Sequence, residues 1–284
     1  MGWILGILLA LVIFFIIVDI LDLNRFVVRT RKVVSDKIKK PVTLVFLSDL
    51  HNQCYGKENK KLLRAIAKQA PDFVVCGGDM IIGQPGRENG NAVRFMDEIA
   101  RNYTCFYALG NHEYRTAVFP DTYGKMYEEY TTPLKEKGVV FLRNEGVFLE
   151  EYNLEIKGLE IDKHFYKKFT VVPMEDNYVE DTLGKKNEEC FTLLLAHNPD
   201  YFPKYEKYGA ELTLSGHLHG GLVRFPFCGG IASPAVRFFP RYNGGMYRRN
   251  GKTMIVSCGL GTHTLPVRIF NPGELTVIKI EPAE

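Results

Sequence analysis

Five short apolar runs in this chain each stop just before side chains that can bind a metal ion. Runs of this length, rich in β-branched and aromatic residues and bounded by turn residues, are typical of buried strands. The residues that follow the five runs are Asp49 and His51, Asp79, Asn111 and His112, His197, and His217 and His219. Ligands of open α/β sheets collect beyond the carboxyl ends of the strands. The pattern therefore predicts a metal centre at one edge of an α/β sheet.

The order of strand and helix patterns predicts two halves in the body of the chain. Residues 42–107 alternate between short apolar runs and amphipathic stretches, which indicates a β-α-β-α-β half with right-handed crossovers. From about residue 139 the apolar runs follow one another with little helix between them, so we expect a second, more antiparallel sheet. The polar stretch 162–189 fits either an insertion at the rim of the site or a plain surface excursion.

The chain begins with an uninterrupted apolar stretch, residues 3–18. Together with apolar residues up to 23, it approaches the roughly 20 residues that cross a bilayer. A signal peptide would need a basic start and a small-residue cleavage site, and neither is present. We therefore expect residues 1–24 to be a retained transmembrane anchor of a single-pass membrane protein.

The segment directly after this stretch is strongly basic. Residues 25–40 hold seven Lys or Arg residues and one Asp. We expect 25–41 to be a juxtamembrane linker that is drawn to anionic headgroups, with a solvated linker as the alternative. The positive-inside rule then places the domain that follows, 42–284, in the cytoplasm. The extracytoplasmic face is the alternative.

Charge and cysteine content exclude two other classes of function. The whole chain carries a formal charge of +3, but the basic segment accounts for +6 of it and the body is near neutral. This argues against broad nucleic-acid binding. The six cysteines are scattered and form no C-x-x-C pair, which removes support for a thiolate zinc site and leans toward a reducing compartment.

The spacing of the candidate ligands has a physical reason. Residues two apart on an extended segment point the same way, so Asp49 and His51 can reach one ion, as can His217 and His219. Of the seven histidines, only His164 and His263 lie away from the ends of the apolar runs. Mixed imidazole and carboxylate ligands suit Zn, Fe or Mn.

These blocks resemble the signature of the calcineurin-like metallophosphoesterases. The blocks, in the order of that family, are Asp49-x-His51, Gly78-Asp79, Gly110-Asn111-His112-Glu113, His197 and Gly216-His217-x-His219. The strings SDLHN, GGDM, GNHEY, SGHLHGG and LPVRIFNP are similar to a membrane-anchored bacterial branch, which itself resembles UDP-diacylglucosamine pyrophosphohydrolases. The resemblance covers about residues 42–281 and implies a two-sheet sandwich flanked by helices. One departure is Leu218, where the branch usually carries Thr.

The resemblance also implies a role for each candidate residue. Two divalent ions (Mn, Zn or Fe) would be bound. The first would be held by Asp49, His51 and His219. The second would be held by Asn111, His197 and His217, and Asp79 would bridge the pair. His112 would not be a ligand but a general acid or charge stabiliser beside the leaving-group oxygen.

The implied activity is hydrolysis of phosphodiester or pyrophosphate bonds by a hydroxide that the two metals activate. The expected partners are the bilayer and a phosphorylated substrate, with a lipid-linked molecule such as UDP-diacylglucosamine as the leading expectation. One alternative is a broad phosphodiesterase acting on soluble substrates. The other is a catalytically silent scaffold of the same fold, which is disfavoured because no ligand position is missing.

Three residues near the blocks are candidates for substrate binding. Arg115 and Arg268 would clamp phosphate, although surface Arg is the commoner case. Asn52 would contact phosphate or cap a turn. Glu113 would orient His112 or lie exposed.

Overall fold

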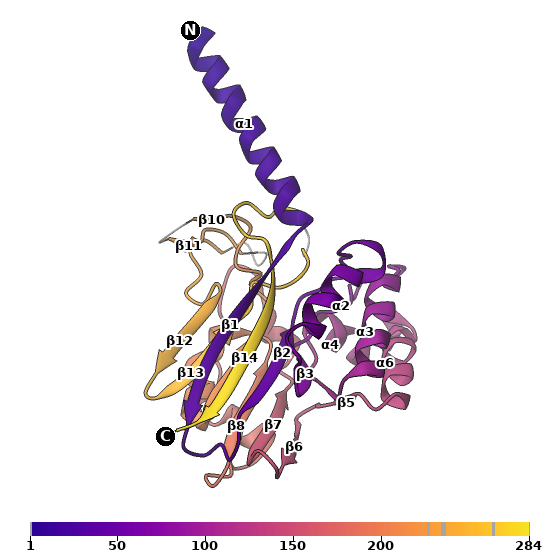
Figure 1. Ribbon diagram of the computed structural model, residues 1–284, viewed down its shortest axis with the longest axis vertical. Helices are drawn as coiled ribbons and strands as arrows, with labels where there is room; N and C mark the ends of the chain where they lie inside the picture. The colour runs from indigo at the N-terminus through magenta and orange to yellow at the C-terminus, as the bar shows by residue number, and fades with distance from the viewer. Residues whose placement is uncertain (1, 226–227, 234–236, 263–264, 284) are drawn as a thin grey trace.

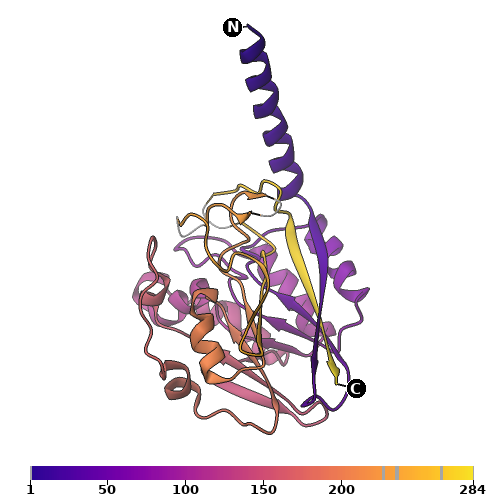
Figure 2. The same cartoon turned by 90° about the vertical axis from the view of Figure 1, so that its left-hand side faces the viewer.

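The computed structural model of the chain describes residues 2–225, 228–233, 237–262 and 265–283. Its body is built on two large β-sheets, and one long helix, α1 (Gly2–Leu23), projects from one end of that body (Figure 1). In the view turned by 90°, α1 also projects from one end of the body (Figure 2). Among the described residues, α1 is the one helix long and apolar enough to cross a membrane, with a mean hydropathy of 3.2.

The first large sheet contains the predicted β-α-β-α-β half. Its strands, in spatial order, are β1 (Phe26–Ser35), β14 (Gly273–Pro282), β2 (Val42–Leu47), β3 (Phe73–Cys76), β4 (Cys105–Tyr107) and β5 (Val140–Phe141). Strands β2, β3, β4 and β5 are parallel neighbours, and β14 runs antiparallel to β2. The carboxyl ends of β2, β3 and β4 therefore meet at one edge.

The second large sheet has more antiparallel pairing, as predicted. Its strands, in spatial order, are β12 (Gly245–Arg249), β13 (Lys252–Val256), β9 (Leu212–Ser215), β8 (Phe191–Ala196), β7 (Leu154–Leu159) and β6 (Glu145–Leu149). The two outer pairs are antiparallel, whereas the central strands are parallel. A separate two-stranded sheet pairs β10 (Arg224–Phe225) with β11 (Gly229–Gly230).

Strand β2 shows why the apolar runs form buried strands. Leu44 and Phe46 lie in the core between the two sheets, whereas Val45 and Leu47 lie in the core under the helices. Because successive side chains of a strand point to opposite faces, a strand covered on both faces needs an unbroken apolar run. The central strand β8 is apolar on both faces for the same reason.

Helices cover the outer face of each sheet. On the first sheet they are α2 (Lys60–Ala67), α3 (Gly90–Asn102), α4 (Asn111–Val118), α5 (Pro120–Tyr123) and α6 (Met126–Glu136). On the second they are α7 (Tyr178–Leu183) and α8 (Phe202–Tyr208). The described chain also has three 3-10 turns, η1 (Lys57–Asn59), η2 (Lys163–Tyr166) and η3 (Pro199–Tyr201). Phe95 of α3 and Val74 of β3 belong to one hydrophobic core, and Tyr205 of α8 and Leu194 of β8 belong to another.

The segment expected to be a basic linker is instead part of the first sheet. Strand β1 pairs in parallel with β14, from Phe26 opposite Gly273 to Ser35 opposite Pro282. Its charges are engaged along the way, for example where Arg29 Nε lies 3.2 Å from Glu274 Oε2. Strand β1 also leads away from the end of α1 (Figure 1), so most of the basic residues do not surround the helix end. The linker prediction is corrected accordingly: the polar pattern belongs to an edge strand with one solvated face.

Candidate metal centre

The candidate ligands come together because the strands that precede them end at neighbouring points. Asp49 and His51 follow β2, Asp79 follows β3, and Asn111 opens α4 after β4. From the second sheet, His197 follows β8, and His217 and His219 follow β9. The site therefore lies where the carboxyl ends of strands from both sheets meet, as expected for an α/β ligand site.

One group of ligand atoms consists of Asp49, His51 and His219. Their ligand atoms all lie within 4.8 Å of one another, and all three residues are buried. His219 Nε2 is 3.4 Å from Asp49 Oδ1 and 3.2 Å from His51 Nε2. This is the set of three that the family resemblance assigns to the first ion.

A second group consists of Asp79, His197 and His217, whose ligand atoms also lie within 4.8 Å of one another. His197 Nε2 is 3.3 Å from Asp79 Oδ2, and His51 Nε2 of the first group is 3.7 Å from the same oxygen. The Asp79 carboxylate thus stands between the two groups, where a bridging ligand belongs.

Asn111 carries an independent sign that a cation fits here. Its Oδ1 is buried and has no hydrogen-bond partner among the described residues. Leaving a buried amide oxygen unpaired costs about 1–3 kcal/mol. A hard or borderline metal ion accepts such an oxygen as a ligand, so the donor set fits the expected cations.

The hydrogen bonds of His197 and His219 fix their tautomers. His197 Nδ1 lies 2.6 Å from the Gly77 carbonyl oxygen, and His219 Nδ1 lies 3.1 Å from that of Gly261. A carbonyl can only accept, so both Nδ1 atoms carry the proton and donate it. The Nε2 lone pairs are left for the site, which is the usual arrangement of metal-ligating imidazoles.

His112 has the opposite arrangement. The backbone N–H of Gly83 donates to its Nδ1 at 2.9 Å. A backbone N–H can only donate, so Nδ1 is unprotonated and the ring proton sits on Nε2. That Nε2 lies 4.0 Å from Asp79 Oδ2. His112 therefore presents an N–H to the site, which suits a proton donor and not a metal ligand.

The site strongly favours positive charge. Burial raises the pKa of Asp49 to about 6. Burial also opposes ionisation of Asp79, yet His197, His112 and His51 hold its pKa well below the usual range. Burial lowers the pKa of His197, but the carboxylates of Asp79 and Asp49 outweigh it and raise that pKa to about 9. Buried carboxylates without a partner cation are costly, so the pocket is built for cations.

The backbone at the site is strained. Five of the ligands have φ between 44° and 70°: Asp49, His51, Asp79, His217 and His219. Residues other than Gly seldom adopt this region, and each instance costs on the order of 1–3 kcal/mol. Space is tight as well, because a Cβ at Gly216 would lie 2.1 Å from Asp49 Oδ2.

Glu113 holds the loop that carries Asp79, the candidate bridging ligand, a role that sequence reasoning left open. It is fully buried, and its Oε2 accepts from the backbone N–H of Asp79 at 2.7 Å and of Gly110 at 3.1 Å. Its Oε1 accepts from Met80 N and from the Tyr107 hydroxyl, both at 2.8 Å. The available signal was its place three residues after Gly110, the capping-box position of α4.

The predicted substrate-binding residues Asn52 and Arg115 are engaged with the backbone. Asn52 Oδ1 accepts from Asn91 N at 2.8 Å and Ala92 N at 3.0 Å, which caps the start of α3. Arg115 Nε donates to the Asn111 carbonyl at 3.0 Å. The contacts of Asn52 are those of a capping residue, which was the alternative to a phosphate contact. Arg115 lies beside the candidate ligand Asn111.

Arg268 is placed differently from the predicted phosphate clamp. It is 2% exposed, and its guanidinium donates to the carbonyls of Asn271, Cys258 and Gly259, and also to that of Gly261. The Gly261 carbonyl is the one that accepts from His219 Nδ1. Arg268 therefore supports the loop behind a ligand, and the clamp prediction is corrected to this structural role.

The 162–189 stretch reaches the site through Tyr166. The Tyr166 ring, in η2, has its centroid 5.1 Å from that of His217 and 6.2 Å from that of His197. Burial raises the Tyr166 pKa well above its ordinary value. His164 is exposed and pairs with Asp162 at 2.8 Å, and His263 lies outside the described residues.

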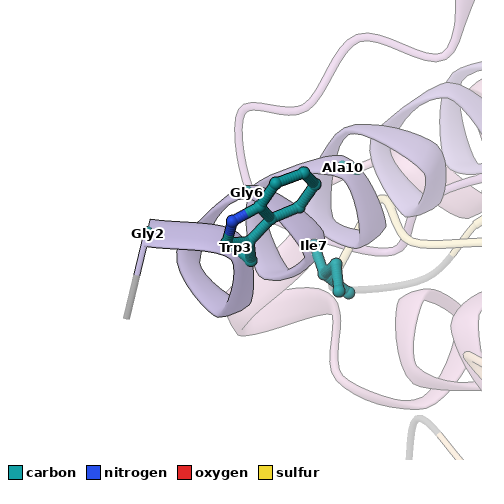
Figure 3. Close-up of a pocket in the computed structure, with 5 residues that line it drawn as sticks. All are labelled: Gly2, Trp3, Gly6, Ile7 and Ala10. Carbon is teal, nitrogen blue, oxygen red and sulfur yellow. The ribbon is translucent and has the colours of Figure 1, made fainter.

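One surface pocket in the described structure contains no side chain that could bind a metal ion. It lies along the first turns of α1 and is lined by Gly2, Trp3, Gly6, Ile7 and Ala10 (Figure 3). None of these side chains titrates or ligates. It is separate from the metal centre.

Comparison with known proteins finds relatives that are named metallophosphoesterases. An uncharacterized metallophosphoesterase of Helicobacter pylori strain 26695 is 27% identical over 254 residues. That match covers 87% of this chain but 62% of the relative, so the chain spans about three-fifths of that protein. The uncharacterized metallophosphoesterase YkuE of Bacillus subtilis is 28% identical, over 84% of this chain and 78% of its own length. UDP-2,3-diacylglucosamine pyrophosphatase LpxG of Chlamydia muridarum is 24% identical, over 83% of this chain and 82% of its own length.

Among solved structures, a 5'-nucleotidase precursor from Thermus thermophilus is similar with a TM-score of 0.45 at 17% identity, over 77% of this chain and 49% of that chain. The family model described as calcineurin-like phosphoesterase matches residues 42–221. This range is more than half of the chain and contains every candidate ligand from Asp49 to His219. The chain belongs to the calcineurin-like phosphoesterase family.

Proposed function

We propose that this protein is a membrane-anchored phosphoesterase that binds two divalent ions and hydrolyses phosphodiester or pyrophosphate bonds. The observation that carries the proposal is the pair of ligand groups that meet at Asp79. One group would hold the first ion through Asp49, His51 and His219. The other would hold the second through Asn111, His197 and His217.

When bound, the two cations supply an activated water and neutralise charge on the phosphoryl oxygens. The protein contributes a dry pocket of fixed geometry, because the ligands are buried and their imidazoles are oriented by backbone carbonyls. The mixture of imidazole, carboxylate and amide oxygen suits Mn, Zn or Fe.

His112 would act as the general acid. The Gly83 N–H keeps the imidazole proton on Nε2, on the side of the ring that faces Asp79. From there it can be transferred to the leaving-group oxygen, a role that typically contributes 10²–10⁴-fold to the rate. The hydrogen bond from Gly83 holds the ring in the orientation that this transfer needs.

The substrate would be lipid-linked, for example UDP-diacylglucosamine. Two observations support this: α1 is apolar enough to span a bilayer, and one similar protein is named a UDP-2,3-diacylglucosamine pyrophosphatase. From the positive-inside rule we expect the domain to face the cytoplasm, since Arg25 and Arg29 follow α1. Protease added to intact cells would remove the domain if it faced outward.

The test uses the full chain, stripped of metal and then loaded with Mn²⁺, Zn²⁺ or Fe²⁺. We expect two ions per chain by elemental analysis, hydrolysis of bis-p-nitrophenyl phosphate, and loss of both with Asp79→Ala. Less than two ions with every metal would favour the scaffold alternative. Equal kcat/KM for UDP-diacylglucosamine and for a UDP-sugar without acyl chains would favour the soluble-substrate alternative.

A further inference from the structure

An exposed apolar surface lies at the end of the body from which α1 projects (Figure 1). We call it the apolar rim, and it consists of Phe225, Phe238, Phe239, Leu265 and Phe270. Phe238 is 73% exposed, Phe239 66% and Leu265 54%. A cluster of large apolar side chains exposed to water promotes aggregation unless a partner covers it.

The rim is continuous with α1. The Phe270 ring lies 6.2 Å from the rings of both Phe14 and Phe15 in α1, and 5.6 Å from that of Phe225 in β10. Both views place β10, β11 and the neighbouring loops at the same end of the body as α1 (Figures 1 and 2). The apolar surface of the helix thus passes into that of the domain.

The position of these contacts along the axis of α1 indicates what covers the apolar rim. The uninterrupted apolar run of α1 ends at Val18, and Asp19 follows. Phe14 lies five residues before Asp19, which is about 7.5 Å along the helix axis. Any bilayer that covers the apolar run as far as Val18 must also cover Phe270 beside Phe14.

The junction between helix and domain is fixed. Asp19 Oδ1 accepts from Arg268 N at 2.6 Å, and Asp22 Oδ2 accepts from Asn271 N at 2.8 Å. Gln53 Nε2 also donates to the Leu23 carbonyl at 2.9 Å. These bonds hold the loop with Phe270 against one side of α1, so the rim and the helix must enter the same medium.

We propose that the apolar rim docks into the interface of the bilayer that α1 crosses and holds the metal centre against the membrane surface. The partner is the lipid itself, since aromatic side chains at the end of an apolar helix match the interfacial belt of membrane proteins. The proposal rests on the proposed anchor, and it adds a second contact with the membrane that the anchor alone does not require.

The rim also adjoins the metal centre. A small recess beside the metal ligand His219 is lined by Leu222, Leu265 and Val267. Leu265 belongs to both the rim and this recess. A substrate that rests in the bilayer by its acyl chains would therefore reach the ligands from the rim side, which gives a lipid-linked phosphoester a path that avoids open water.

The experiment measures contact with lipid directly. The only tryptophan, Trp3, is first replaced (Trp3→Phe), and a single reporter is then introduced by Phe239→Trp in the full chain. The matched control is Phe148→Trp, since Phe148 is 48% exposed but lies in β6, at the end of the body away from α1 (Figure 1). Both proteins are placed in phosphatidylglycerol and phosphatidylethanolamine vesicles with brominated acyl chains.

Interfacial aromatics sit at headgroup level, so the reporter at position 239 should be quenched at least about twofold more than the one at 148. Equal quenching at the two positions would overturn the proposal. Fluorescence at 239 that depends on protein concentration and not on brominated lipid would overturn it too, and would assign the rim to contact between copies. The readout needs no catalysis, so it succeeds or fails separately from the proposed hydrolase activity.

Discussion

Asp22, in the last turn of α1, is hydrogen bonded to a residue that supports the metal centre. Its Oδ2 accepts from the backbone N–H of Asn271 at 2.8 Å. The side-chain amide of Asn271 in turn donates to the carbonyl of His219 at 2.7 Å. The helix is therefore joined to a candidate metal ligand through a single intervening residue.

Replacing Asp22 should weaken this junction. Asp22 is 1% exposed and also pairs with Arg25 at 2.7 Å. Asp22→Ala leaves the Asn271 N–H buried without an acceptor, which should cost about 1–3 kcal/mol in the free energy of unfolding. Urea unfolding in detergent measures the change. The exposed Asp36, changed to Ala, serves as control, and equal stabilities of the two variants would contradict the expectation.

Replacing His112 should slow turnover without loss of metal. His112→Asn removes the proton on Nε2 but none of the proposed ligands, so kcat for bis-p-nitrophenyl phosphate should fall by roughly 10²–10⁴. Elemental analysis should still give the wild-type metal content. His197→Asn is the matched comparison and should lose metal. If the His112 variant loses metal as well, the assignment of its ring to proton transfer is wrong.

Replacing Glu113 should loosen the bridging carboxylate. The two oxygens of Glu113 accept from Asp79 N, Gly110 N, Met80 N and the Tyr107 hydroxyl. Glu113→Gln turns one acceptor into a donor that faces N–H groups, so we expect a loss of about 1–3 kcal/mol and weaker metal binding. Thermal unfolding and a metal titration measure these. Glu128→Gln on the exposed face of α6 is the control, and a Glu113 variant that matches it would refute the role.

The pH dependence of stability should include a contribution from Glu211. Burial alone would raise its pKa, but the Thr192 N–H and the ammonium groups of Lys37, Lys186 and Lys252 outweigh burial and lower it. A lowered pKa means that the folded state holds the carboxylate more strongly than the unfolded state does. The stabilisation is therefore complete above the ordinary pKa of 4.5 and disappears as the pH falls through the lowered value.

Glu211→Gln measures this contribution. At pH 7 the variant should be less stable than the wild type by about 1–3 kcal/mol, as for hydrogen bonds to charged groups. The difference should shrink as the pH falls from 4.5 through the lowered pKa, where the wild-type carboxyl becomes neutral as well. Glu175→Gln, at an exposed position, is the control. A difference that stays constant into the acid range would show that the charge of Glu211 is not the cause.

The ligand positions could be predicted because local sequence determines them. Each candidate ligand follows a strand that is buried on both faces. Such a strand can be recognised in the sequence as an unbroken apolar run. Parallel pairing then brings Asp49 after β2 and Asp79 after β3 to the same edge. The edge of the sheet was enough to anticipate where the candidate ligands meet. The side-chain spacing was not, because the backbone at Asp49, His51, His217 and His219 has positive φ and is not extended, and His217 and His219 belong to different groups.

The features that were not predicted depend on tertiary contacts. Strand β1 is half exposed, so its pattern resembles a polar linker until β14, more than two hundred residues later, pairs with it. Arg268 lies in a string that suggests phosphate binding, yet backbone carbonyls from its own loop surround its guanidinium. Tyr166 reaches His217 from an irregular segment whose path no periodicity reveals.

Adding one methyl group at Gly216 should remove the first metal. A Cβ there would lie 2.1 Å from both Asp49 Oδ2 and Ser48 Oγ, well inside contact distance. The Ser48 hydroxyl donates to that same Asp49 oxygen, so neither group can move without giving up the bond. In Gly216→Ala we expect the ion held by Asp49, His51 and His219 to be lost.

Elemental analysis of Gly216→Ala should therefore give about one ion per chain or fewer, and phosphodiesterase activity should fall at least 10²-fold, as expected when one half of a two-metal site is lost. The control is Gly6→Ala in α1, where an added Cβ meets nothing within 4 Å. If Gly216→Ala retained two ions and wild-type activity, the Asp49 carboxylate would have to bind its ion from another position, and the grouping of Asp49 with His51 and His219 would be wrong.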